Sequence, residues 1–317
     1  MRFRPLATLS VAAAAVLLLA GCSGSSSPDA SASPSGSAAD LCSTAAPSGA
    51  ASDAVSVTGD FGTESTATFT SPIDVTELQR TVVTEGEGDP VASGELISYA
   101  LTAFSADTGE KLGSIGYTPG EVLPAQISPD NPLGQIIGCA TPGTRIVATF
   151  PASEDTSSEV YIVDLLATVP NAAWGDPQPA VAGLPTVTLD DTGAPTIEIP
   201  EGDAPAELQL ADLKKGDGEV VASGDTVLVQ YTGVLWSDGS VFDSSWQNGA
   251  PASFQTTGVV PGFQQALEGQ TVGSQVLAVI PPALGYGDAD SGKIPGGSTL
   301  VFVVDILGVQ HAAAAAQ

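Results

Sequence analysis

Residues that carry covalent, acid–base or metal chemistry are scarce in this 317-residue chain. The one histidine, His311, lies in an alanine-rich tail, so a Ser/His/Asp triad, a Cys/His pair and a histidine-based metal site have nothing to be built from. The glycines of 285–287 and 296–297 have no Walker lysine pattern and no strand–GxGxxG–helix context around them, which argues against a phosphate cradle. The sequence therefore predicts no metal and no cofactor.

Aromatic side chains and one carboxylate remain as candidates, between Val227 and Phe302, and short structural elements must position them. Alternation of residue types with a period of two predicts strands, and an apolar pattern at helical spacing between a proline and a glycine predicts one short helix. One helix laid across an antiparallel sheet is an α+β domain. The predicted strands are 227–232, a second that ends at 242, 275–280 and 299–307, and the predicted helix is 261–268.

Five short motifs follow one another through this stretch. They are YTG at Tyr231, VFDSS up to Ser245, VVPGFQQALEG at 259–269, LGYG at 284–287 and IPGGSTLVFVVDIL at 294–307. Each motif alone is weak, but five in this order at suitable spacing resemble the FKBP-type peptidyl-prolyl cis-trans isomerases. The resemblance covers about the last third of the chain, from Glu207 to Val309.

The resemblance implies rotation about X–Pro peptide bonds, a reaction that needs no nucleophile, base or metal. Amide resonance sets a barrier of ~18–20 kcal/mol, and the unaided rotation takes seconds to minutes. The planar amide is more polar than the twisted one, so an apolar cup that excludes water favours the twisted transition state. Aromatic walls provide such a cup.

The family's site can be carried over residue by residue, and the resemblance then implies nine positions around the substrate proline. They are Phe263 as the floor under the ring, Tyr231, Phe242 and Phe302 as walls, Val259 and Val260 at the entrance, with the Val260 N–H bonding a substrate carbonyl, Tyr286 as a hydroxyl donor, Ile294 as a cover, and Asp243 as the carboxylate that faces the twisting amide.

Some of these residues also have a purely structural interpretation. Tyr231, Phe302 and Val260 would be core residues in any such domain, and Asp243 before two serines could cap a turn. For Tyr286, in a glycine-flanked loop, the structural and the functional interpretations both stay open. It is the joint pattern that predicts a site.

The sequence also departs from the family's pattern. Asn248 stands where the family often has an arginine that pairs with the aspartate, and Ala252 stands where it has a further aromatic residue, a gap that Phe254 partly fills. These departures predict weaker or differently selective catalysis. Binding of a macrolide immunosuppressant is a further expectation that the resemblance implies.

An internal repeat decides the domain organisation. At an offset of 130 residues, the segment from Val57 to Pro151 matches a later one without gaps, as in the VASG of 91–94 and of 221–224. The final strand repeats at an offset of 141, because the first copy lacks eleven residues of the loop around Tyr286. The repeat predicts two tandem FKBP-like domains, each an antiparallel sheet wrapped on one short helix, at 42–169 and 184–310, with a linker at 170–183.

The two copies differ where the chemistry would lie. Along the repeat, Tyr231 falls on Leu101, Phe242 on Leu112, Asp243 on Gly113, Val260 on Asp130 and Phe263 on Leu133. The sheet and the helix survive in the first copy, but the aromatic set does not. The first domain is therefore expected to be a degenerate, non-catalytic copy, with a diverged but working isomerase as the alternative.

The amino terminus has the pattern of an exported lipoprotein. Residues 1–21 carry two arginines and then an apolar run too short to span a bilayer, as in a signal peptide. The run closes on a lipobox-like LAGC, which predicts lipidation of Cys22; the alternative is an ordinary signal peptide with a cysteine nearby by chance. Residues 22–41 are rich in Ser, Ala, Gly and Pro and predict a flexible tether, and residues 311–317 predict a disordered tail. The expected location is the outer face of the cell membrane.

Charge and cysteine content agree with export. Without its leader the chain has six basic residues against 36 acidic ones, so phosphate backbones repel it and nucleic acid is excluded as a partner. The acidity itself is typical of a solvated surface and not of a binding site. Two cysteines, Cys42 and Cys139, remain besides the lipobox, and an oxidising exterior favours a disulfide between them over two buried free thiols.

The predicted function is an extracytoplasmic peptidyl-prolyl cis-trans isomerase that acts on proline-containing unfolded or exported polypeptides and is held to the membrane by a lipid anchor. The alternative is a lipoprotein that uses its FKBP-like domains for binding, as a chaperone or interaction platform without turnover. A solute-binding lipoprotein is disfavoured, because such proteins bind between two α/β lobes and this chain lacks βαβ alternation.

Overall fold

The computed structural model of the chain describes residues 40–313. The leader, Cys22 and most of the tether lie outside these residues, as do the last four residues of the chain. Among the residues that are described, no helix is long and apolar enough to cross a membrane. Two antiparallel sheets account for most of the structure, one formed by strands between residues 79 and 169 and one by strands between residues 176 and 310. The parts of the chain around these sheets are called the first and the second domain.

The sheet of the second domain has the order β14-β13-β17-β16-β12-β9, and β15 also pairs with β13. Neighbouring strands are antiparallel, and Gly233 of β13 lies opposite Phe302 of β17. The strands are β9 (Asp176–Pro177), β12 (Gln209–Lys215), β13 (Thr226–Leu235), β14 (Val241–Ser244), β15 (Ala252–Gln255), β16 (Gln275–Ile280) and β17 (Leu300–Gln310).

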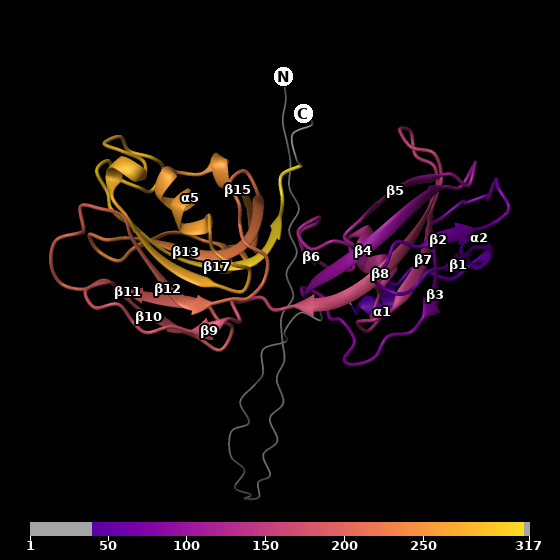
Figure 1. The fold of residues 1–317 in the computed structure, drawn as a ribbon, viewed down its shortest axis with the longest axis horizontal. Coiled ribbons are helices and arrows are strands. Elements are labelled where there is room, and N and C mark those ends of the chain that lie inside the picture. The colour runs from indigo at the N-terminus through magenta and orange to yellow at the C-terminus, as the bar shows by residue number, and fades with distance from the viewer. Residues whose placement is uncertain (1–39, 314–317) are drawn as a thin grey trace, which may run out of the picture. The chain divides into compact units, whose positions relative to one another are not determined.

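Helix α5 (Pro261–Leu267) lies against one face of this sheet, as Figure 1 shows. It begins at the proline that the sequence predicts and ends two residues before Gly269. Its buried side chains, including Phe263 and Leu267, pack with the alternate residues of β13, β16 and β17 that point to this face. Alternate residues of these strands therefore point to the same face, as the period-two pattern predicts, and the helix side of the sheet forms one apolar core.

The opposite face of the same sheet is covered by a hairpin. Strands β10 (Thr186–Leu189) and β11 (Pro195–Glu198) pair with each other as a separate two-stranded sheet (Figure 1). Val187 and Ile197 of the hairpin pack against a second cluster, formed by the residues of β13, β16 and β17 that alternate with those of the first core. The domain therefore has three layers, helix, sheet and hairpin, with apolar contacts on both faces of the sheet.

The first domain repeats this architecture. Its sheet has the order β3-β7-β8-β4-β5 with β6 on β4, which matches β12-β16-β17-β13-β14 with β15 on β13 in the second sheet, where β9 is an additional edge strand. Helix α3 (Pro132–Ile137) packs on one face and the hairpin β1–β2 on the other. The strands are β1 (Ser56–Thr58), β2 (Thr66–Thr68), β3 (Gln79–Thr84), β4 (Leu96–Ser105), β5 (Lys111–Ile115), β6 (Ala125–Gln126), β7 (Arg145–Phe150) and β8 (Glu159–Val169).

Short helices complete both domains. They are α1 (Leu41–Thr44), α2 (Ala50–Asp53) and α4 (Ser245–Asn248), and single turns cover Thr256–Gly258 and Pro282–Leu284. The Sγ atoms of Cys42 in α1 and Cys139 after α3 are bonded at 2.04 Å. This disulfide links the start of the first domain to the end of its helix, across a sequence separation of 97 residues.

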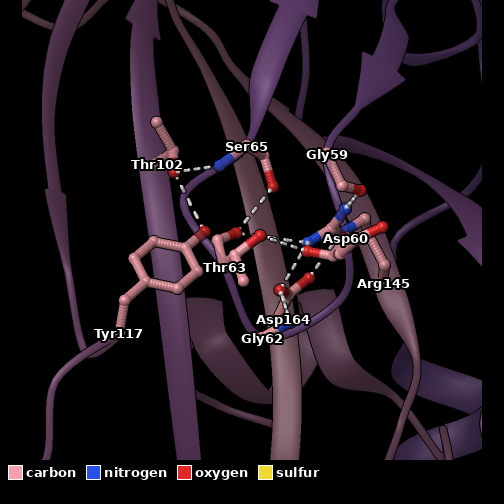
Figure 2. Close-up of polar contacts among 9 residues, drawn as sticks. All are labelled: Gly59, Asp60, Gly62, Thr63, Ser65, Thr102, Tyr117, Arg145 and Asp164. Carbon is pink, nitrogen blue, oxygen red and sulfur yellow. Dashed lines mark hydrogen bonds and ion pairs between the residues drawn. The ribbon is translucent and has the colours of Figure 1, made fainter.

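A buried ion pair lies between β7 and β8 in the first domain (Figure 2). The guanidinium of Arg145 donates to both carboxylate oxygens of Asp164, at 2.6 and 2.7 Å, and both side chains are almost fully buried. Arg145 also donates to the backbone carbonyls of Gly59 and Asp60, while the N–H of Gly62 donates to Asp164. Through these hydrogen bonds, the pair holds the loop between β1 and β2 against the sheet.

The second domain keeps the carboxylate but changes its partner. Gln275 and Asp305 occupy the places of Arg145 and Asp164, and the Gln275 amide donates to Asp305 at 2.7 Å. Burial raises the pKa of Asp305, against hydrogen bonds from Gln275 and from the backbone N–H of Ala173, at 2.9 Å. Ala173 belongs to the segment 170–183, which the sequence predicts to be a linker and which also supplies β9 to this sheet.

Candidate active site

A cavity of about 300 Å³ opens beside helix α5, between the helix and the sheet of the second domain. Of the nine positions that the resemblance implies, every one except Ile294 lines this cavity, and Phe254 and Gly258 line it as well. The lining is therefore aromatic and aliphatic, apart from two tyrosine hydroxyls and one carboxylate. Its residues are Tyr231, Phe242, Asp243, Phe254, Gly258, Val259, Val260, Phe263, Tyr286 and Phe302.

The aromatic rings pack against one another edge to face. Phe302 lies between two of them, with ring centroids 4.8 Å from Phe263 and 5.3 Å from Phe242. Phe254 extends the cluster, at 5.6 Å from Tyr231 and 5.8 Å from Phe263. Such T-shaped pairs are favourable beyond their buried area, by about 0.5–1.5 kcal/mol each, so the walls of the cavity support one another.

Gly233 allows the walls to meet. It lies on β13 opposite Asp243 of β14 and Phe302 of β17, two residues after Tyr231. A Cβ at this position would lie 2.5 Å from Cζ of Phe242 and 2.8 Å from Cε1 of Phe302, closer than real Cβ contacts come. The last residue of the YTG motif is thus part of the site, although sequence reasoning named only its tyrosine.

Tyr231 and Asp243 form the polar edge of the cavity. The Tyr231 hydroxyl donates a hydrogen bond to Oδ2 of Asp243. Burial, this hydrogen bond and the carboxylate's negative charge raise the pKa of Tyr231 well above its ordinary value. The phenol therefore stays protonated at physiological pH and fixes the direction in which the carboxylate points.

The two serines after Asp243 hold β14 in register. The buried hydroxyl of Ser245 accepts a hydrogen bond from the backbone N–H of Tyr231 at 2.8 Å. The hydroxyls of Ser244 and Thr232 are 2.9 Å apart and hydrogen-bonded across the strands. Ser244 thus ties the end of β14 to β13, and Ser245 ties the start of α4 to β13, which accounts for the serines of the motif in physical terms.

Asp243 has no cationic partner. Within residues 40–313, no Lys, Arg or His nitrogen lies within 4.0 Å of its carboxylate, and the residue is exposed at the mouth of the cavity. Asn248, which stands in the family's arginine position, ends helix α4 and is exposed. Among the described residues, the Tyr231 hydroxyl is the one group that donates a hydrogen bond to this carboxylate.

Val260 presents a backbone donor at the entrance. It is the residue before the first turn of α5, with an extended backbone, and Pro261 follows it. Its N–H donates to no other residue in the described part of the chain. Because a backbone N–H needs an acceptor, this group is available to a carbonyl of a bound ligand.

Tyr286 and Ile294 come from the loop between β16 and β17 but lie at different depths. Tyr286 lines the cavity and has 46% of its surface exposed. Ile294 is only 7% exposed and packs in the apolar core with Phe263 and Leu300 instead of lining the cavity. Backbone hydrogen bonds between Ser291 and Ile294 close the loop over this contact.

The corresponding region of the first domain has different chemistry. Leu101 and Leu133 are partly buried against its core, and Leu112, in the place of Phe242, is 54% exposed. Gly113, in the place of Asp243, has no side chain to offer. The first domain thus shares strand pairings with the second but has different residues at four of the positions that line the cavity there.

Comparison with known proteins agrees with this geometry. Residues 218–307 match the family described as FKBP-type peptidyl-prolyl cis-trans isomerase. An FK506-binding protein of Streptomyces anulatus is 43% identical over 119 residues, which are 36% of this chain and 96% of that protein. A probable FK506-binding protein of Corynebacterium glutamicum is 39% identical over 113 residues, again 36% of this chain and 96% of that protein.

FkpA of Escherichia coli, an FKBP-type peptidyl-prolyl cis-trans isomerase, is 44% identical over 100 residues, which are 32% of this chain and 37% of that protein. The similarity falls on the second domain, where the aromatic cavity lies. The cavity, the five motifs and relatives that are matched over almost their whole length lead to one conclusion: this chain belongs to the family of FKBP-type peptidyl-prolyl cis-trans isomerases.

Proposed function

We propose that the cavity of the second domain catalyses rotation about X–Pro bonds of exported polypeptides outside the cytoplasmic membrane. The observation that carries the proposal is the lining itself, six aromatic rings around a space of about 300 Å³ with a single carboxylate at its edge. This volume suits a small ring such as that of proline, and the lining leaves no group that would attack a peptide covalently.

The proposed mechanism uses shape and polarity. Phe263 is the floor under the proline ring, and Tyr231, Phe242 and Phe302 surround it. Removal of the X–Pro amide from water costs more for the planar, polar ground state than for the twisted state, which lowers the barrier between them.

The polar groups at the edge orient the substrate. The Val260 N–H and the Tyr286 hydroxyl each donate to a substrate carbonyl, which fixes the chain on both sides of the rotating bond. Asp243, with its direction set by Tyr231, places negative charge beside the carbonyl carbon of the rotating amide, which becomes more electron-poor as resonance with the nitrogen is broken. None of these groups exchanges a proton, so no general base is needed.

Substitutions between the two domains test the site. In the full chain, Phe242→Leu and Phe263→Leu introduce the residues that the first domain carries at Leu112 and Leu133. Each is expected to lower kcat/KM for a proline peptide about tenfold, which is about 1.4 kcal/mol of transition-state stabilisation. The matched control, Leu112→Ala, is expected to leave the rate unchanged. No acceleration by the unaltered chain, or equal rates in all variants, would contradict the proposal.

We propose further that the first domain binds without turnover, since its floor, wall and carboxylate positions hold leucine and glycine. Suppression of client aggregation that persists in Phe263→Leu but falls in Leu112→Asp and Leu133→Asp would support a binding role. If Phe263→Leu alone abolished suppression, the second domain would be the binding site and this assignment would be wrong.

The anchor on Cys22 is also a proposal, and it rests on the LAGC sequence at the end of the leader. Two or three acyl chains hold a protein stably to a membrane, whereas one does so only marginally. In cells, the unaltered chain should be found in the membrane fraction and Cys22→Ser in the medium or soluble fraction. Equal fractionation of the two would overturn the anchor.

The name of the Streptomyces relative suggests a ligand for the same cavity. We propose that FK506 competes with proline peptides here. Isomerase activity should fall as FK506 is titrated, and Phe263→Leu should weaken the inhibition. Full activity at saturating FK506 would show that the cavity does not accept the macrolide.

A further inference from the structure

The cavity of the second domain has an uncompensated negative charge at its mouth. Asp243 is the only charged residue of its lining, and no basic nitrogen in residues 40–313 lies within 4.0 Å of it. The carboxylate is exposed and accepts one hydrogen bond, from the Tyr231 hydroxyl, on Oδ2. Its other oxygen, Oδ1, is available to a group that enters with the substrate.

Basic residues are few around the cavity. Between residues 184 and 313 there are sixteen Asp and Glu but, besides His311, only three basic residues. Two of these three belong to β12 and are occupied, since Lys214 donates to the Ala173 carbonyl at 2.7 Å and Lys215 lies 3.5 Å from Asp212. The third, Lys293, is exposed in the loop after Tyr286 and forms no ion pair with a carboxylate.

A carboxylate beside the rotating amide is also beside the side chain that precedes the proline. When a peptide enters, its backbone and the proline ring displace water from the Asp243 carboxylate, which strengthens the attraction of a cation and the repulsion of an anion. The net negative field of the domain acts in the same direction at longer range.

We propose that this isomerase is selective for a basic residue, lysine or arginine, immediately before the proline, and that Asp243 is the residue that recognises it. The proposal rests on the proposed function of the cavity and names its substrate class. Asp243 is then a specificity-determining residue as well as a part of the catalytic site.

The test compares three peptides that differ only at the residue before proline, which is lysine, norleucine or glutamate. Norleucine has the aliphatic stem of lysine without its charge, so the comparison separates charge from hydrophobic contact. At low ionic strength, kcat/KM with the full-length protein is expected to fall in the order lysine, norleucine, glutamate. Each step is about two- to five-fold, as expected for ion pairs that are partly exposed to water.

Two variants and salt identify the source of the selectivity. Asp243→Asn lowers the rate with all three peptides and brings the lysine-to-glutamate ratio close to one. Asn248→Arg, which supplies a cation next to α4, also reduces the ratio. Asp217→Asn removes an equal charge from an exposed acid outside the cavity and leaves the ratio unchanged. Salt at about 1 M, where the Debye length is ~3 Å, reduces it in the unaltered protein.

The outcomes separate the two proposals. Acceleration of all three peptides to the same extent would refute the charge selectivity and leave the isomerase intact. A ratio that survives Asp243→Asn, or that falls equally in Asp217→Asn, would refute Asp243 as its source. No acceleration of any peptide would refute the proposed function itself, and the charge selectivity with it.

Discussion

A Cβ on Gly233 would lie 2.5 Å from Cζ of Phe242, because β13 passes directly behind the ring. The strand and two walls of the cavity therefore meet at a position where only a hydrogen fits. Gly233 is therefore part of the packing that holds these two rings in place.

Gly233→Ala is expected to push Phe242 and Phe302 out of place and to lower kcat/KM by about tenfold or more, because small displacements at a reacting centre are costly. Overpacking would also lower the free energy of unfolding by about 1–3 kcal/mol. Gly113→Ala, on β5 of the first domain where a Cβ meets nothing within 4 Å, is the control and should affect neither quantity. Unchanged activity in Gly233→Ala would show that the walls can move without loss.

Tyr231→Phe tests the hydrogen bond to Asp243. We expect a loss of about 1 kcal/mol in the free energy of unfolding at neutral pH, since the bond involves a charged acceptor that is exposed to water. The pKa of Tyr231 is raised in the folded chain, so the proton is held more tightly there than in the unfolded chain. Its contribution is therefore complete below the unfolded pKa, about 10, and is lost as the pH rises above it.

Urea unfolding of the unaltered chain and of Tyr231→Phe between pH 8 and pH 11.5 would measure this effect. The difference between the two free energies should be constant at first and should shrink above about pH 10. Other tyrosines titrate in both proteins and cancel in the difference. Parallel curves over the whole range would mean that the phenol proton has no such role.

The ion pair of Arg145 and Asp164 is expected to stabilise the first domain. Arg145→Ala leaves the Asp164 carboxylate buried without its partner, which is expected to cost about 3–5 kcal/mol. Arg145→Gln imitates Gln275 beside Asp305 in the second domain and should cost less. In both variants the amides of residues 59–65 should exchange faster with solvent, because the loop carbonyls lose their donor. Equal destabilisation by the two substitutions would argue against the comparison between the domains.

The disulfide is expected to stabilise the first domain without affecting catalysis. Closure of a loop with a separation of 97 residues stabilises the folded chain by up to ~4–5 kcal/mol in the chain-entropy model. The double substitution of Cys42 and Cys139 to serine should lower the melting temperature of the first domain, while kcat/KM for proline peptides stays unchanged. Lost activity in this variant would imply that the second domain depends on the first.

Much of the second domain could be predicted because its elements have strong local patterns. Helix α5 begins at a proline and ends near a glycine, and β16 is a run of apolar residues whose bounds, Gln275–Ile280, are those that the sequence predicts. The cavity could be predicted because its aromatic residues fall in short motifs with family-like spacing. The fold class, α+β, is confirmed for the same reason.

Other features depend on contacts between distant residues. The strands β10 and β11 alternate polar and apolar residues around a turn, but this local pattern does not say which sheet face the hairpin covers. Gly233 matters because of two rings from other strands, and a glycine in a strand does not reveal what faces it. The ring of His311, in the segment predicted to be a tail, lies 2.8 Å from Asp225, a contact that depends on where β17 ends.

The β10–β11 hairpin has a practical consequence for anyone who wishes to isolate the catalytic unit. The region that matches the family begins at residue 218, yet the hairpin and β12 lie before it and shield Val234, Leu277 and Val301 from water. A fragment that contains only the matched region would expose this apolar face of the sheet to solvent and is expected to self-associate. The smallest soluble enzyme should therefore start upstream of Leu184, at the segment that bonds to Asp305.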